Sequence, residues 1–164
     1  MDLRKIEGSF LRDIGLYKNH LMSLFLNSDD ICCLMLNKNQ APPDTDSLAY
    51  TQIFPYLYVD ETQTEVKSYL CFEVDIPNIP SHTIKNMEIT IWAYCHKDCM
   101  KYSKQGFSGT RTDILADMVE RSLRNSNEFG IGKLSLTKVS TFFPTTVHYG
   151  RQLKFLVPDF KISQ

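Results

Sequence analysis

Apolar positions in the first part of the chain recur at the spacing of a helix. Between residues 9 and 27 they return every three or four positions, which places them on one helix face. Residues 28–36 follow with Ser28 as a candidate N-cap, two acids in the first turn and a short apolar run. The pattern therefore predicts two helices within residues 9–36. An aperiodic stretch with two prolines predicts a loop over residues 37–52.

After this loop the pattern changes to a two-residue alternation. The segments SYLCFEVDI (residues 68–76) and MEITIWAYCH (residues 87–96) alternate strictly, as strands with one buried face do. A helical period returns between residues 110 and 125, where Thr110 and Asp113 resemble a capping box. We therefore expect two adjacent strands followed by a third helix.

Two further strands are predicted towards the end of the chain. KLSLTKVSTFF (residues 133–143) changes its apolar phase near Lys138, which indicates a bulge or bend, and RQLKFLV (residues 151–157) alternates regularly. A short strand, PYLYVD (residues 55–60), is expected to pair with one of the others. The order α, α, β, β, β, α, β, β predicts an α+β fold with a mostly antiparallel sheet of four to five strands and helices packed on one face.

A single domain is predicted for residues 1–164. A chain of this length with 43% hydrophobic residues can bury one sizeable core. We divide it into an N-terminal helical segment (9–36), a loop (37–52) and a sheet plus helix core (53–160). The formal net charge is −1 and no block of like charges occurs, so a footprint for nucleic acid or an anionic membrane is missing.

Targeting features are also missing from the sequence. No run of about 18 apolar residues occurs, and the first ten residues lack the apolar core of a secretory signal. We therefore expect the chain to fold in a host cytoplasm. Its five cysteines should then be mainly reduced rather than a disulfide framework.

The stretch WAYCHKDC, residues 92–99, raises the question of a metal or a thiol site. On a strand Cys95 and His96 point to opposite faces and cannot share one metal, although Cys95 and Cys99 could meet if the chain turned between them. Structural zinc needs four ligands, and the other Cys and His residues do not stand at knuckle spacing. A nucleophilic cysteine needs a partner histidine and electropositive surroundings. We interpret the stretch as a strand end and expect no metal and no cofactor. No role is assigned to Cys32, Cys33, Cys71, Cys95 and Cys99.

Other candidate motifs have simpler interpretations. FGIGKLS resembles the end of a phosphate-binding loop, but Asn127 and Leu134 stand where that motif requires Gly and Ser or Thr. A turn that ends the third helix is the preferred interpretation. Pairs of adjacent acids do not aim at one point, so they favour solvated turns over acid–base catalysis. Arg151, which follows Gly150, either faces a partner or lies exposed to solvent.

Five segments carry a resemblance to a known family. They are YTQIFPYLYVDETQTEVKSYLCFEVDIP, ITIWAYCHKDCMKY, TRTDILADMVERSL, FGIGKLSL and HYGRQLKFLVPDF, spread between Tyr50 and Phe160. Their succession resembles the tail-completion or tail-terminator proteins of tailed bacteriophages. The order of helices and strands is similar to that of this family, whereas Cys99, Cys32 and Cys33 have no counterpart in its pattern.

The resemblance implies a structural virion protein and not an enzyme. Members assemble as a ring, commonly of six copies, which caps the tail tube and docks to the connector beneath the capsid. The implied location is the neck of the virion, with the host cytoplasm before assembly, and DNA could pass through the ring without specific binding.

Candidate interface residues are Trp92, Tyr94, Arg111 and Arg151. Trp92 and Tyr94 face away from the aliphatic side of their strand, as interface anchors do. A second buried layer against a helix would explain these two aromatic residues equally well.

Three other interpretations remain open. The chain could be a head-completion adaptor or a stopper protein of the same neck, because these proteins are small and occupy adjacent layers. It could also be a small cytoplasmic adaptor module, or an enzyme with a cysteine–histidine centre or a bound metal.

Overall fold

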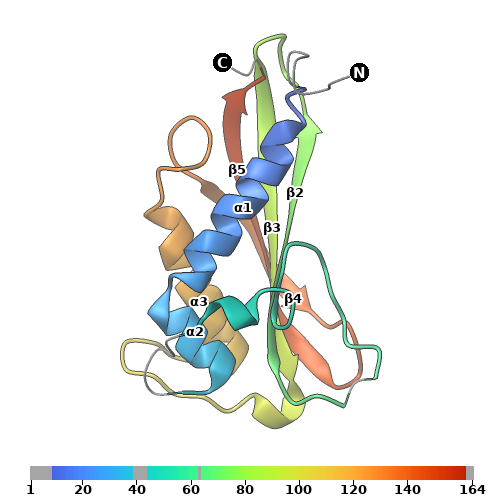
Figure 1. Cartoon of the computed structure of the whole chain (residues 1–164), viewed down its shortest axis with the longest axis vertical. Coiled ribbons are helices and arrows are strands. Elements are labelled where there is room, and N and C mark those ends of the chain that lie inside the picture. Colours follow the sequence, from blue (N-terminus) through green and yellow to red (C-terminus); the bar gives the residue numbers. More distant parts are fainter. Residues whose placement is uncertain (1–8, 39–43, 63, 162–164) are drawn as a thin grey trace.

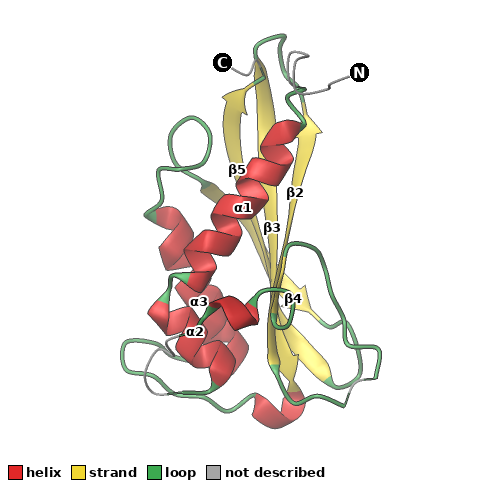
Figure 2. Cartoon of the chain, in the orientation of Figure 1, coloured by secondary structure: helices red, strands yellow, loops and turns green. Residues whose placement is uncertain are grey.

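Five strands form one sheet, and the helices cover a single face of it (Figures 1 and 2). The computed structural model describes residues 9–38, 44–62 and 64–161. Its helices are α1 (Arg12–Leu26), α2 (Asp29–Leu36) and α3 (Arg111–Arg124), with short 3-10 turns η2 (Asp46–Leu48) and η3 (Lys97–Cys99). Its strands are β1 (Ile53–Phe54), β2 (Ser68–Asn78), β3 (Ile84–His96), β4 (Ser135–Phe142) and β5 (His148–Phe160).

The sheet has the order β1-β2-β3-β5-β4. β1 runs parallel to β2, and every other pair is antiparallel. The predicted α+β fold, the element order and the placement of helices on one face are confirmed, with one parallel pair in the sheet.

The helices form where the sequence pattern predicts them. α1 buries Tyr17, Leu21 and Phe25, and the Phe25 ring meets Phe72 of β2 edge-on at 5.7 Å between centroids. Ser28 caps α2 as predicted, because its side chain accepts a hydrogen bond from the Ile31 amide. These contacts fix the helical segment onto the aliphatic face of the sheet.

α3 begins at the predicted capping box. The Thr110 side chain accepts from the Asp113 amide, and the Asp113 carboxylate accepts from the Thr110 amide. The helix then buries Ile114, Leu115 and Val119 against β3 and β5. The cap therefore sets where α3 starts and which face it turns towards the sheet.

The bulge predicted near Lys138 is present. The pairing of β4 with β5 shifts register between Leu136 and Lys138. Because one residue is added there, Leu136 and Val139 come to lie on the same face, across from Phe155 and Leu153 respectively.

The helix-free face carries a second, aromatic layer. Tyr69 and Tyr94 are buried and stack with 5.2 Å between ring centroids, and Phe54 stacks on Tyr58 at 4.2 Å. The segment after β1 covers this layer, so the second buried layer packs against a loop rather than a helix.

The predicted strand over residues 55–60 is wrong. The strand in this region is β1, which ends at Phe54, and Pro55 follows directly without an amide hydrogen to donate. Residues 55–60 instead place Tyr58 on Phe54 and leave the Tyr58 carbonyl to accept from the Tyr94 hydroxyl. Tyr58 therefore packs on the helix-free face of the sheet instead of pairing as part of a strand.

A buried histidine makes folding sensitive to acid. His148 is fully buried, its Nδ1 lies 2.8 Å from the Thr145 hydroxyl, and its Nε2 has no hydrogen-bond partner among the described residues. Burial, together with the nearby His96, lowers the pKa of His148 below its ordinary value of 6.5. Below pH 6.5 the imidazole of His148 becomes protonated in the unfolded chain, whereas in the folded chain it stays neutral to a lower pH. Acid therefore favours unfolding.

We therefore expect the free energy of unfolding to fall as the pH drops below about 6.5. Urea unfolding followed by circular dichroism between about pH 7.5 and about pH 5 measures this. His148→Gln should flatten the pH dependence, whereas His82→Gln, at an exposed histidine, should leave it unchanged. Equal slopes in the wild type and His148→Gln would contradict the assignment.

Candidate assembly surfaces

β4 is one outer strand of the sheet and is exposed along most of its length. Val139 is 54% exposed, although Leu153 directly across from it on β5 is buried. The cause is that α3 packs over β5 and β3 and leaves β4 uncovered. Outer backbone groups of such a strand are free to pair with another chain. We define the β4 edge by its exposed apolar residues, Leu136, Val139 and Phe143.

The opposite edge of the sheet, formed by β1, exposes a different set of side chains. Tyr50 is 62% exposed and lies beside Tyr56, with 6.4 Å between ring centroids, and Leu57 is exposed next to them. Tyr50 has a φ of 61°, in a left-handed region that bulky residues avoid at a cost of about 1–3 kcal/mol. We define the β1 edge by Tyr50, Tyr56 and Leu57.

The two edges differ in charge. Residues 44–67, which flank β1, include five acids and one lysine, whereas residues 133–143 around β4 include two lysines and no acid. Lys133 and Lys138 are exposed beside the β4 edge, and Glu61 is exposed beside the β1 edge. Opposite charge on opposite edges favours contact of the β4 edge of one copy with the β1 edge of another.

A continuous layer of rings connects the two edges across the helix-free face. Its centroid separations are 5.7 Å (Tyr56–Phe54), 4.2 Å (Phe54–Tyr58), 5.8 Å (Tyr58–Tyr69), 5.2 Å (Tyr69–Tyr94) and 5.6 Å (Tyr94–Phe142). Ring contacts of this kind contribute about 0.5–1.5 kcal/mol each beyond the buried area. The layer therefore connects Tyr56 of the β1 edge with Phe142 of β4.

Two of the predicted interface residues belong to this layer. Tyr94 is fully buried and donates its hydroxyl to the Tyr58 carbonyl, so it packs inside the subunit. Trp92 is half-buried and packs on Phe142, with 6.3 Å between ring centroids. Of the two, Trp92 retains a surface that a partner can reach.

Arg111 serves the interior of the subunit. It is only 5% exposed, and its Nε donates to the Cys99 carbonyl at 2.6 Å and its Nη1 to the Leu34 carbonyl at 2.9 Å. Its Nη2 donates to Asn37 Oδ1 at 2.9 Å, and the guanidinium lies 4.5 Å from the centre of the Tyr102 ring. Arg111 therefore joins α2, η3 and α3. Because its guanidinium is bonded inside the subunit, the geometry does not favour direct contact with a partner.

Arg151 is half-buried and forms a partly exposed ion pair with Asp113. Its Nε donates to Asp113 Oδ1 at 2.8 Å, which joins β5 to the first turn of α3. Although burial opposes the shift, hydrogen bonds from Arg151 and Thr110 lower the pKa of Asp113 below its ordinary value. Arg151 thus combines an internal partner with a partly accessible side chain.

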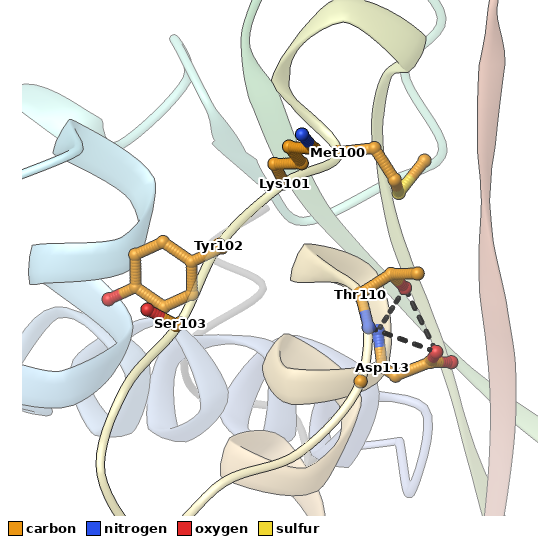
Figure 3. Close-up of a pocket in the computed structure, with 7 residues that line it drawn as sticks. Met100, Lys101, Tyr102, Ser103, Thr110 and Asp113 are labelled. Atoms are coloured by element: carbon orange, nitrogen blue, oxygen red, sulfur yellow. Dashed lines mark hydrogen bonds between the residues drawn. The ribbon is translucent and has the colours of Figure 1, made fainter.

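A surface hollow of about 710 Å³ lies beside this ion pair (Figure 3). Figure 3 shows Thr110 and Asp113 facing one another at its rim, where the Thr110 hydroxyl donates to Asp113 at 2.9 Å. The described lining residues include one carboxylate, Asp113, which Thr110 and Arg151 already engage. The remaining lining residues are Met100, Lys101, Tyr102, Ser103 and Gly109. The hollow therefore surrounds a capped helix start and lacks a second carboxylate for acid–base catalysis.

Groups of three or more His, Cys, Asp or Glu side chains placed to hold a metal ion do not occur among the described residues. None of the helices described has the length and apolar character to cross a bilayer.

Comparison with known proteins gives one family match. The family model YomW matches residues 28–157, most of the length of the chain. The chain belongs to the YomW family. The name is that of a phage-derived, Bacillus SPβ-type protein, so the predicted phage association is confirmed at this level. A search of the curated proteins finds no match.

The YomW region contains both edges of the sheet. Residues 28–157 run from the N-cap of α2 to β5 and include the β1 edge, the β4 edge and the ring layer between them. α1 lies before the matched region and contributes to the aliphatic core. The sequence did not identify either edge as a candidate interface. It did show the change of phase near Lys138, and the β4-edge residues Leu136, Val139 and Phe143 lie before and after that change.

Proposed function

We propose that this chain is a structural, non-catalytic subunit of a tailed bacteriophage that assembles into a ring at the head–tail junction. There the ring would terminate or complete the tail and join the tail tube to the connector. Support comes from the phage-associated YomW family, from the resemblance of five segments to tail-completion proteins, and from the geometry of the two edges.

The two unlike edges are the observation that carries this proposal. A two-fold dimer uses the same patch on both copies, whereas contact between different patches is head-to-tail and closes into a ring when the rotation permits. The β4 edge is apolar and basic, and the β1 edge is aromatic and flanked by acids. Each would complement the other, and six copies is the number we expect.

The position of the edges suits such a ring. They lie on the first and last strands of the sheet, so a neighbour can bind at each side without covering the helices. A stable contact of this kind buries about 800 Å² per partner. Pairing through β4 would also cover backbone groups that otherwise invite aggregation.

The oligomeric state tests this proposal. We expect light scattering across a concentration series, of the chain alone and mixed with its tail tube and connector proteins, to give a discrete multiple of the 19.0 kDa chain. Electron microscopy of the same sample should show closed rings. Binding to the tail tube protein would favour a terminator, and binding to the connector alone would favour a head-completion adaptor or stopper. A monomer at every concentration and with every partner would contradict the proposal.

A further inference from the structure

The turn after β3 brings two cysteines together. β3 ends at His96, whose Nδ1 accepts a hydrogen bond from the Asp98 amide at 3.1 Å and so caps the short turn η3. This turn reverses the chain between Cys95 and Cys99. The Cys95 and Cys99 side chains are hydrogen-bonded to one another, so the two thiols meet, a point that the sequence left open.

The two thiols differ in their surroundings. Cys95 is fully buried, with its Sγ 3.6 Å from the Met100 Sδ. Cys99 is partly exposed, and its Sγ donates to the His96 carbonyl at 3.3 Å. One thiol is therefore accessible from outside, and the other stands behind it in the core.

The surroundings of Cys99 favour its thiolate. A hydrogen bond with Cys95 lowers the pKa of Cys99 to about 7 against the opposing effect of burial, and the positive charge of Arg111 and a hydrogen bond with Ser68 add to the lowering. The same contact with Cys99 raises the pKa of Cys95. Among the ion pairs of the described residues none joins Arg111 to a carboxylate, so its charge is not neutralised before it acts on Cys99.

A small hollow gives access to this thiol. Its volume is about 230 Å³, and Cys99, Arg111, Lys67 and Ser68 are among its lining residues. Lys67 is ion-paired with Glu65, so Arg111 is the cation that acts on the thiol in a space that a small molecule can enter. An accessible thiol in an electropositive site is what reactivity towards disulfides requires.

We propose that Cys99 and Cys95 form a reactive dithiol, in which Cys99 attacks small-molecule disulfides and Cys95 resolves the adduct. In the first step the Cys99 thiolate displaces one thiolate from the small disulfide and forms a mixed disulfide. In the second step the Cys95 sulfur attacks the Cys99 sulfur, the Cys95 proton passes to the leaving thiolate, and a Cys95–Cys99 disulfide remains. Both electrons go to the small disulfide, which is reduced to two thiols.

The other cysteines provide an internal contrast. Burial raises the pKa of Cys71 to about 12, and burial followed by Asp29 raises that of Cys32 to about 11. Both are buried, and neither is among the described lining residues of the hollow at Cys99. At neutral pH we expect Cys99 to react at least tenfold faster than either, because the thiolate is the nucleophile.

Reaction with oxidised glutathione at about pH 7.4, followed by intact mass and peptide mapping, tests the dithiol. The wild type should lose two hydrogens and yield a peptide in which Cys95 is linked to Cys99. Cys95→Ser should stop at one glutathione adduct on Cys99, and Cys99→Ser should give neither product. Cys71→Ser, which removes a buried thiol elsewhere, should behave as the wild type, with circular dichroism confirming that each variant is folded.

Two results would overturn the inference. One is a stable glutathione adduct on Cys99 of the wild type with Cys95 still free, which would show that the thiols do not exchange. The other is alkylation of Cys99 by iodoacetamide with a midpoint near the pH of an ordinary thiol, about 8.5. This test does not depend on the proposed ring, so its result supports or contradicts the dithiol whether or not the ring forms.

Discussion

Replacing Gly150 with alanine is expected to destabilise the folded chain by on the order of 3 kcal/mol. Gly150 lies in β5 across from Tyr94 on one side and Phe142 on the other. A Cβ at this position would lie 1.9 Å from the Ala93 carbonyl oxygen and 2.5 Å from the Tyr94 Cα. These are backbone atoms of the central strand, so relief requires the sheet itself to move. Urea unfolding followed by circular dichroism measures the change.

Gly15→Ala is the matched control for this substitution. Gly15 is exposed within α1, and a Cβ there meets no heavy atom within 4 Å. Alanine in a helix interior is favoured over glycine by about 1 kcal/mol, so this variant should be more stable than the wild type. If Gly150→Ala unfolded at the same urea concentration as the wild type, the close approach of β3 and β5 at this point would be wrong.

Local patterns in the sequence were sufficient for most of the fold. The helices follow from apolar spacing, the start of α3 from the Thr110 and Asp113 pair, and the bulge in β4 from a change of phase near Lys138. Each depends on neighbours a few residues apart, so the pattern contains the information. The order of elements then left few arrangements in which helices cover one face of a sheet.

Features that depend on distant contacts could not be predicted in this way. The segment at residues 55–60 was predicted to be a strand, but its Tyr58 packs on a face formed by Tyr69 and Tyr94. Likewise, Arg111 has the sequence position of an exposed first-turn residue, yet it donates to carbonyls of α2 and η3. Nothing within a few residues of either segment indicates those partners.

The candidate interface also combines features that local patterns predict with features that depend on distant contacts. Sequence reasoning selected Trp92 and Tyr94 because they face away from the aliphatic side, and the structure uses Tyr94 inside the ring layer. The exposed edges follow from which strands are outermost, and strand order is set by long-range pairing. The phase slip near Lys138 was the one local sign that β4 places the exposed apolar residues Leu136 and Val139 on the same face.

Replacing Val139 with glutamate is expected to prevent assembly while leaving the monomer folded. Val139 is 54% exposed in the monomer, so the change removes little buried area from the subunit. In the proposed contact it would place a carboxylate in an apolar patch facing the acids around β1, which should weaken association at least tenfold. Light scattering measures the mass, and Leu11→Glu, a change at a similarly exposed residue (56%) at the start of α1, is the control that should still assemble.

A mixing experiment distinguishes the head-to-tail contact from a symmetric one. Leu57→Glu, which alters the β1 edge, should also remain monomeric when it is alone. Mixed with Val139→Glu, it retains an intact β4 edge that can meet the intact β1 edge of the other variant, so the pair should form one contact and stop at twice the mass of one chain. In a symmetric contact between two β4 edges, Leu57→Glu would assemble unaided. That result would exclude the ring contact proposed between β4 and β1, because the β1 edge would then have no part in assembly.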